Sequence, residues 1–426
     1  LLHTVALLAL TGAALAGAAL GDEADEETGS ASGGVDRAAL ARLSAEVTPE
    51  VAEGVERIRG LEFERVPRAR VVDAEFINEL GAREARRGGA ARGLAVDEAA
   101  ARLLGLLPPD QGLDAVLEST GDLAAAAYDT RRDRLYLIAD AGFDDRTLIE
   151  FFLAHELTHA LEDQHFGLPE TENPSDDAAL AELALTEGTA TAVMVEYARR
   201  HLNPGRLLAA TTAIDAGRGD VPAFVVEQLE LAYLRGAAFV EELYTLGDGW
   251  ALVNDALVNR PPASSEQVLH PEAYVRVSAP LQTGIEGAEI ERRGWRRLGG
   301  GDLGEAATAQ LLGVGAPPEA ARGAAEGWGG DHYALWARDS SALDCTTDCA
   351  DRLVLVVRWR WDSREEAREF ARALATYVLR GLDAQREHGD TFAVGEGSAA
   401  VDRGGDSVTL ALAPNAWVSR LAAGSP

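Results

Sequence analysis

Residues 147–166 read TLIEFFLAHELTHALEDQHF, and within them His155 to His159 form an HExxH motif. Positions i and i+4 share one face of a helix, so the imidazoles of His155 and His159 can bind one metal ion together. Glu156 lies beside them, where it can act as a base on a water molecule without being a ligand. The stretch therefore predicts a metal-binding helix.

The apolar periodicity of this stretch favours a helix that faces a core. One face repeats at steps of three and four, with Leu148, Phe152, His155, His159, Glu162 and Phe166. Histidines within an apolar stripe need polar partners, and a divalent ion would supply them. The alternative is a buried helix whose two histidines are satisfied by hydrogen bonds within the protein.

A second apolar stripe predicts the third ligand. Residues 178–202 read AALAELALTEGTATAVMVEYARRHL, and one helical face carries Leu180, Leu183, Glu187, Ala190, Met194 and Tyr197. Glu187 is thus a carboxylate in the middle of a buried stripe, where an unpaired charge is costly. Two histidines and one glutamate with an open fourth position form a catalytic zinc set. We therefore predict Zn²⁺ bound by His155, His159 and Glu187.

Other assignments for the third ligand remain open at this point. Glu187 could instead form an ion pair with an arginine in the core. His165, Asp176 and Asp177 are rival ligands, although they are less well placed than Glu187. Gly188, next to Glu187, would let the two metal-binding helices approach closely.

Further candidates for catalysis lie later in the chain. His270, in NRPPASSEQVLHPEAY, is a candidate hydrogen-bond donor to the transition state, although a plain histidine at a helix end is the favoured explanation. Tyr233 and Tyr274 are weaker candidates. His332 reads as a turn histidine that opens a strand.

The composition excludes some classes of function. The chain has 426 residues, 47% of them hydrophobic, and a formal net charge of −31 with no lysine. Such a charge repels nucleic acid and anionic membranes, so we expect neither as a partner.

The first 35 residues predict export. Residues 1–20 are apolar and end in small residues, which is typical of a partial signal peptide; the alternative is a membrane anchor. Residues 21–35 are acidic and predict a disordered linker. We therefore expect an extracellular, periplasmic or cell-surface protein, with membrane association only through the N-terminus. Cys345 and Cys349 in DCTTDC predict a disulfide, with a metal site as the alternative.

The order of predicted elements favours an α+β fold. A helix over 36–59, a strand near 66–72 and a hairpin around a turn at 129–133 precede the HExxH helix. We assign residues 36–289 to a mainly helical metallopeptidase domain with this small sheet. From residue 290 the pattern predicts a smaller α+β module, with two helices, a strand, a helix and two closing strands.

These motifs resemble two groups of proteins. HELTHALEDQHF followed by ALTEGTA resembles gluzincin-type metallopeptidases, in which HExxH pairs with a glutamate on a later helix. With PPASSEQVLHPEAY and GWGGDHYALW added, residues 61–374 are similar to a family of exported or cell-surface proteins of archaea and bacteria. The resemblance implies a zincin-like domain, zinc on His155, His159 and Glu187, and Glu156 as the base.

The sequence thus predicts an exported zinc metallopeptidase that acts on a peptide or protein substrate. One alternative is a surface or periplasmic binding protein that kept the zincin fold without catalysis. Another is a zinc hydrolase of a non-peptide amide of the cell envelope, because the metal chemistry would be the same.

Overall fold

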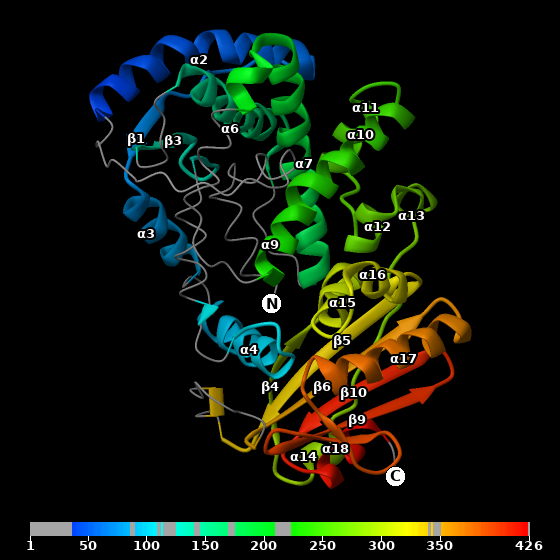
Figure 1. Cartoon of the computed structure of the whole chain (residues 1–426). Helices are drawn as coiled ribbons and strands as arrows, with labels where there is room; N and C mark the ends of the chain where they lie inside the picture. The colour runs from blue at the N-terminus through cyan, green and yellow to red at the C-terminus, as the bar shows by residue number, and fades with distance from the viewer. Residues whose placement is uncertain are drawn as a thin grey trace.

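The computed structural model describes residues 36–85, 90–108, 112–113, 125–139, 145–168, 175–208, 223–339, 342–343 and 351–424. The predicted signal peptide and linker, and the predicted Cys345–Cys349 disulfide, lie outside these residues. Within them the chain is α+β, as the sequence predicts (Figure 1).

A small three-stranded sheet opens the fold. The first elements are α2 (Arg37–Arg59), β1 (Ala69–Val72), α3 (Ala74–Ala85), α4 (Ala90–Leu103), β2 (Ala126–Asp129) and β3 (Arg134–Ile138). The strands β2 and β3 form the predicted hairpin, and β1 joins β3 in parallel to give the order β1-β3-β2. Successive side chains of β3 point to opposite faces of the sheet. Leu135 and Leu137 therefore pack into the core with α2 and α6, whereas Tyr136 and Ile138 pack against α3.

Two long buried helices follow the sheet. They are α6 (Arg146–Phe166), which carries HExxH, and α7 (Asp176–His201), which carries Glu187. The carboxylate of Asp145 caps α6 by accepting a hydrogen bond from the Thr147 N–H at 2.7 Å. The two helices pack against each other, and α2 lies across α6 (Figure 1). Among the described helices, α7 is long and apolar enough to cross a membrane, but most of it is buried in the protein core.

The next helical segment, Ala223–Leu246, has one irregularity. It consists of α9 (Ala223–Glu230), a π-helical turn (Leu231–Arg235) and α10 (Gly236–Leu246). Short helices follow in the chain: α11 (Ala251–Val258), α12 (Ser265–Leu269), α13 (Pro271–Arg276) and α14 (Ala288–Glu291). Ser264 caps α12 by accepting a hydrogen bond from the Gln267 N–H.

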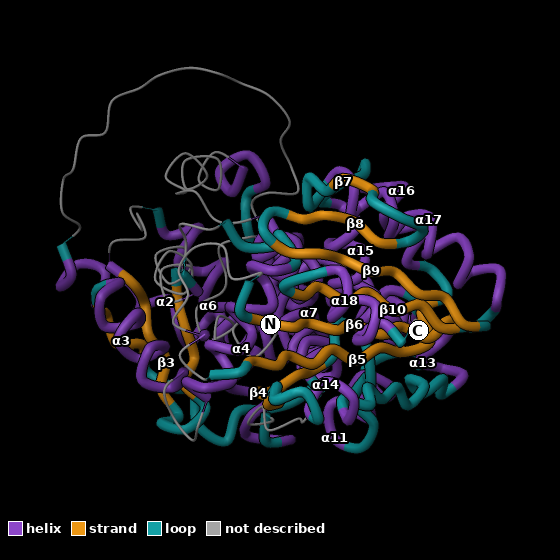
Figure 2. Tube along the Cα trace, turned by 90° about the horizontal axis from the view of Figure 1, so that it is seen from below, coloured by secondary structure: helices purple, strands orange, loops and turns teal. Residues whose placement is uncertain are grey.

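The C-terminal part is larger than the sequence indicated. Its elements are β4 (Arg296–Gly301), α15 (Gly304–Gly313), α16 (Pro318–Ala325), β5 (Trp328–Ala337), β6 (Leu353–Trp361), α17 (Arg364–Arg380), β7 (Gln385–Arg386), β8 (Thr391–Val394), β9 (Gly397–Gly404), β10 (Ser407–Ala413) and α18 (Ala416–Ala423). The strands form one antiparallel sheet in the order β4-β5-β6-β10-β9-β8-β7 (Figure 2). The sequence predicted a strand followed by two closing strands, and a further strand opened by His332, which lies within β5. It did not predict β4, β7 and β8, which are short or rich in glycine.

Helices cover both faces of this sheet. The helices α15, α16 and α17 pack on one face, and α14 and α18 pack on the other. The largest hydrophobic core continues from this sheet into α4, α7, α9 and α10. The division at residues 289/290 therefore stays a prediction, because one core extends across it.

Candidate metal centre

The HExxH helix brings its two histidines together as predicted. His155 and His159 are one helical turn apart on α6, and their Nε2 atoms lie 3.1 Å from each other. Both side chains are buried. Two imidazoles that meet through the same ring nitrogen in a dry core need either a shared proton or a third partner.

The third partner is Glu187 from α7. Its Oε2 lies 3.0 Å from His155 Nε2 and 3.4 Å from His159 Nε2, and the carboxylate is buried. The three residues form a buried group that can hold a metal ion. The partners of Glu187 are thus histidines, whereas the buried arginine of this region, Arg59, pairs with Glu162. Among the described residues, Glu187 therefore forms no ion pair with an arginine.

The spacing of the three ligand atoms fits a tetrahedral zinc ion. Ligands about 2.0–2.2 Å from zinc at tetrahedral angles lie roughly 3.3 Å from one another. The separations of 3.0, 3.1 and 3.4 Å are close to this value. The donor set of two imidazoles and one carboxylate is also one that zinc takes in catalytic sites. These residues therefore fit the metal that the sequence predicts.

Burial and the attraction between Glu187 and the two histidines shift the pKa values of this centre in opposite directions. Burial by itself would raise the pKa of Glu187, but the two histidines more than offset it and hold that pKa at about 2. Burial lowers the pKa of His155. For His159, burial acts in the same direction, but the Glu187 carboxylate raises its pKa to about 9.

Glu156 is the buried acid next to the ligands. Burial raises its pKa to about 7, although the neighbouring His159 and the main chain of Tyr128 on β2 act to lower it. A carboxyl group that titrates near neutral pH can both accept and return a proton. This is the proton affinity that the predicted role of Glu156 as a base requires.

Tyr233 also reaches the centre. It lies on the π-helical turn between α9 and α10, and its ring centroid is 5.9 Å from that of His155. Its hydroxyl is buried with no well-formed hydrogen bond to the described part of the chain. Burial and the charges of Glu187 and Glu156 raise its pKa well above the usual value, so it remains a proton donor. Single π-turns of this kind often occur at functional sites. The sequence gave Tyr233 only as a weaker candidate, because a π-turn interrupts the helical periodicity that shows which side chains share a buried face.

The other candidates lie elsewhere. His270 sits between α12 and α13, where its Nε2 is 2.9 Å from Glu305 Oε1, a residue outside the centre; its catalytic role stays a prediction. The Tyr274 hydroxyl donates to the Arg260 carbonyl. The His165 ring contacts the carbonyl of Glu62. His332 lies within β5, beside Arg297.

Asp176 and Asp177 begin α7, far along the helix from Glu187. Asp177 accepts a hydrogen bond from the Ser265 N–H, and a Cβ added at Gly304 would collide with its carboxylate. Asp177 therefore joins α7 to α12 and α15, and the rival ligands do not meet the two histidines.

Gly188 does permit a close approach, but to a different helix than predicted. A Cβ at Gly188 would collide with the main-chain carbon of Gly236, and one at Gly236 would collide with the Ala184 carbonyl oxygen. The close contact thus joins α7 to the start of α10, rather than α7 to α6. It fixes the π-turn, and with it Tyr233, against the helix of Glu187.

A buried ion pair joins the HExxH helix to α2 close to the centre. Glu162, one turn after His159, pairs with Arg59 from α2, whose guanidinium also donates to the Asn254 side chain and stacks on Trp250. The sequence placed Glu162 on the buried stripe of the HExxH helix but gave no partner for it. Nothing in the local pattern of α2 distinguishes Arg59 from its exposed arginines.

Comparisons with known proteins add little about this centre. Residues 293–421 match a family model described as a domain of unknown function, DUF8575; the match spans the seven-stranded sheet and none of the three ligands. No curated protein matches the chain. One solved structure, a proposed hydrolase with a novel fold from Chloroflexus aurantiacus, is 16% identical, with a TM-score of 0.39; the similarity covers 65% of this chain and 98% of that one.

Proposed function

We propose that the protein is an exported zinc-dependent metallopeptidase that cleaves peptide or protein substrates. The observation that carries the proposal is the convergence of His155, His159 and Glu187 within ligand distance of one another, beside the buried carboxyl group of Glu156. A structural zinc site usually uses four protein ligands, whereas three ligands and an adjacent base are typical of a hydrolytic one. The resemblance of the HExxH and ALTEGTA motifs supports the same function.

The residues of the chain would divide the work as follows. His155, His159 and Glu187 would hold the zinc ion, which when bound acts as a Lewis acid and makes water a better nucleophile. Glu156 takes a proton from the attacking water on its carboxylate and returns it to the nitrogen of the leaving amine. The Tyr233 hydroxyl donates a hydrogen bond to the carbonyl oxygen as negative charge develops on it.

A cleavage assay on unfolded protein substrates tests the proposal. We expect cleavage that a chelator abolishes and added zinc restores. The Glu156→Gln variant should lose turnover while it keeps its metal, and Glu182→Gln, on α7 away from the centre, should keep both. A Glu156→Gln variant that still cleaves would rule out this mechanism.

A second candidate is a metal-binding surface protein without catalysis. It is favoured by the burial of the centre, since none of the three ligands or Glu156 is more than 7% exposed. Zinc in the purified protein together with no cleavage of any peptide substrate would favour this candidate. Cleavage of a non-peptide amide by the same preparation would instead favour a hydrolase of an envelope amide, the remaining alternative.

A further inference from the structure

A pocket lined by three arginines lies on the small sheet. It encloses about 450 Å³, and its lining residues are Arg70, Phe76, Leu80, Arg132, Arg134 and Tyr136. The arginines and Tyr136 come from β1, β3 and the turn that precedes β3, while Phe76 and Leu80 come from α3. None of the described residues that line the pocket is acidic, although the whole chain carries a formal charge of −31.

The register of the strands brings the polar groups to one face. Arg70 of β1 is the direct partner of Tyr136 on β3, and Arg134 precedes Tyr136 by two residues, so all three side chains point to the same side of the sheet. Arg132 adds a third guanidinium, part of whose charge is offset by Asp129 at 2.5 Å. Arg70 and Arg134 have no carboxylate partner among the described residues.

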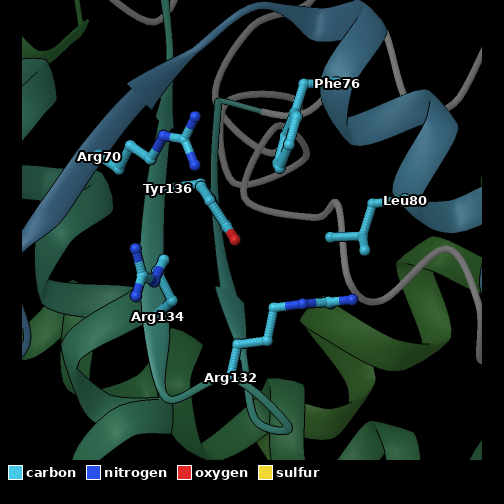
Figure 3. Close-up of a pocket in the computed structure, with 6 residues that line it drawn as sticks. All are labelled: Arg70, Phe76, Leu80, Arg132, Arg134 and Tyr136. Atoms are coloured by element: carbon cyan, nitrogen blue, oxygen red, sulfur yellow. The ribbon is translucent and has the colours of Figure 1, made fainter.

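Tyr136 gives the pocket a polar floor. Only 2% of its surface is exposed, yet its hydroxyl has no hydrogen-bond partner in the described part of the chain. Figure 3 shows this hydroxyl and the Arg132 guanidinium pointing into the space that the Phe76 ring and the Leu80 side chain also face. A hydroxyl held in this way can donate to a bound anion without rearrangement of the pocket.

The pocket is separate from the metal centre. Leu135 and Leu137 of β3 pack into the core that contains α6, whereas Tyr136 packs with Ile77 and Leu80 of α3. The arginines therefore lie on the face of the sheet that is turned away from the HExxH helix.

From these observations we infer that this pocket binds a small organic anion. Its carboxylate contacts the guanidinium groups of Arg70 and Arg134 and the Tyr136 hydroxyl, and its apolar or aromatic group lies against Phe76 and Leu80. Planar guanidinium groups match the two oxygens of a carboxylate. The volume suits a small organic molecule, and the half-apolar lining suits such a ligand better than an inorganic anion. The inference does not depend on the proposed peptidase activity.

Calorimetric titration of the full chain tests the inference with N-acetylphenylalanine as the probe. We expect saturable binding of this acid and at least about tenfold weaker binding of its uncharged amide, because charged hydrogen bonds distinguish the two. Inorganic phosphate should bind more weakly than the acid. Arg70→Gln and Arg134→Gln should each weaken binding of the acid by about tenfold. The matched control is Arg372→Gln, an exposed arginine on α17, which should bind the acid like the wild type.

Several results would overturn the inference. The first is the absence of saturable binding, and the second is equal binding of the acid and its amide. The third is an affinity that neither arginine substitution changes, which would place the acid at another site, such as the metal centre. Phosphate binding as tight as that of the acid would overturn the organic character of the ligand. Because Arg70 and Arg134 are exposed, their substitution should leave the fold intact, and circular dichroism checks this.

Discussion

Arg59 and Glu162 form an ion pair of 2.8 Å between Nε and Oε1, and both side chains are wholly buried. The pair joins α2 to the HExxH helix one turn beyond His159. Each charge is tolerated in the core only because the other is present. The orientation of the HExxH helix therefore depends on a residue about a hundred positions earlier in the chain.

Breaking this pair should destabilise the fold. We expect Glu162→Gln or Arg59→Met to lower the free energy of unfolding by about 3–5 kcal/mol, because each leaves an unpaired buried charge. Urea denaturation measures the change. The exposed pair Arg292–Glu289 is the control, and Glu289→Gln should change stability by no more than about 1 kcal/mol. Equal effects at both sites would contradict this account.

Loss of Glu187 should release the metal. Glu187→Ala removes one of three ligands and leaves two histidines, so purified protein should lose its zinc by elemental analysis. Glu182→Ala on the same helix should retain it. If Glu187→Ala keeps full metal content, the carboxylate is not a ligand.

Tyr233→Phe should slow turnover without loss of metal. The phenol is the buried donor beside His155, and removal of one such donor costs about a hundredfold in kcat. Steady-state kinetics should show this in kcat, with KM little changed. Tyr274→Phe is the control, because that hydroxyl donates to a carbonyl outside the centre. A Tyr233→Phe enzyme with normal kcat would exclude the tyrosine from catalysis.

Asp177 should contribute less to stability as the pH rises through the acidic range. Burial, with the charges of Asp302 and Asp331, raises the pKa of Asp177 well above its usual value. Above about pH 4 the Asp177 carboxyl group therefore keeps its proton in the folded state and loses it in the unfolded state. The stability that this group contributes is fully present below that pH. As the pH rises above it, the free energy of unfolding falls by about 1.4 kcal/mol per pH unit. Asp177→Asn should flatten the dependence and stabilise the protein at neutral pH. Denaturation curves of the two proteins across this pH range measure the change in the free energy of unfolding. If Asp177→Asn leaves its slope against pH unchanged, Asp177 does not hold the proton.

Gly188→Ala should destabilise the protein, because its Cβ would collide with the main chain of Gly236. We expect a loss of about 1–3 kcal/mol, as for other overpacked cores. Gly323→Ala provides the control: Gly323 lies within α16 with open space at its Cβ, and alanine there should stabilise by about 0.5–1 kcal/mol. Thermal melts of the two variants should move in opposite directions.

Local sequence patterns were sufficient to predict the class of the fold and to single out His155, His159 and Glu187, which the structure brings together. The spacing in HExxH and the apolar stripes around it are local properties, since a helix of known period fixes which side chains share a face. That is why the burial of His155, His159 and Glu187 could be predicted from residue spacing alone. The hairpin before α6 followed in the same way from its turn residues.

The residues that surround these three, in contrast, are set by the packing of distant segments. Three features show this: the pairing of Arg59 with Glu162, the contact of Gly188 with Gly236 instead of α6, and the position of the π-turn residue Tyr233 beside His155. Each brings together segments that are far apart in the chain. The arginine pocket likewise exists only because β1 lies in parallel beside β3. Such relationships depend on how whole elements pack against one another in three dimensions, and no local pattern of residue types records that packing.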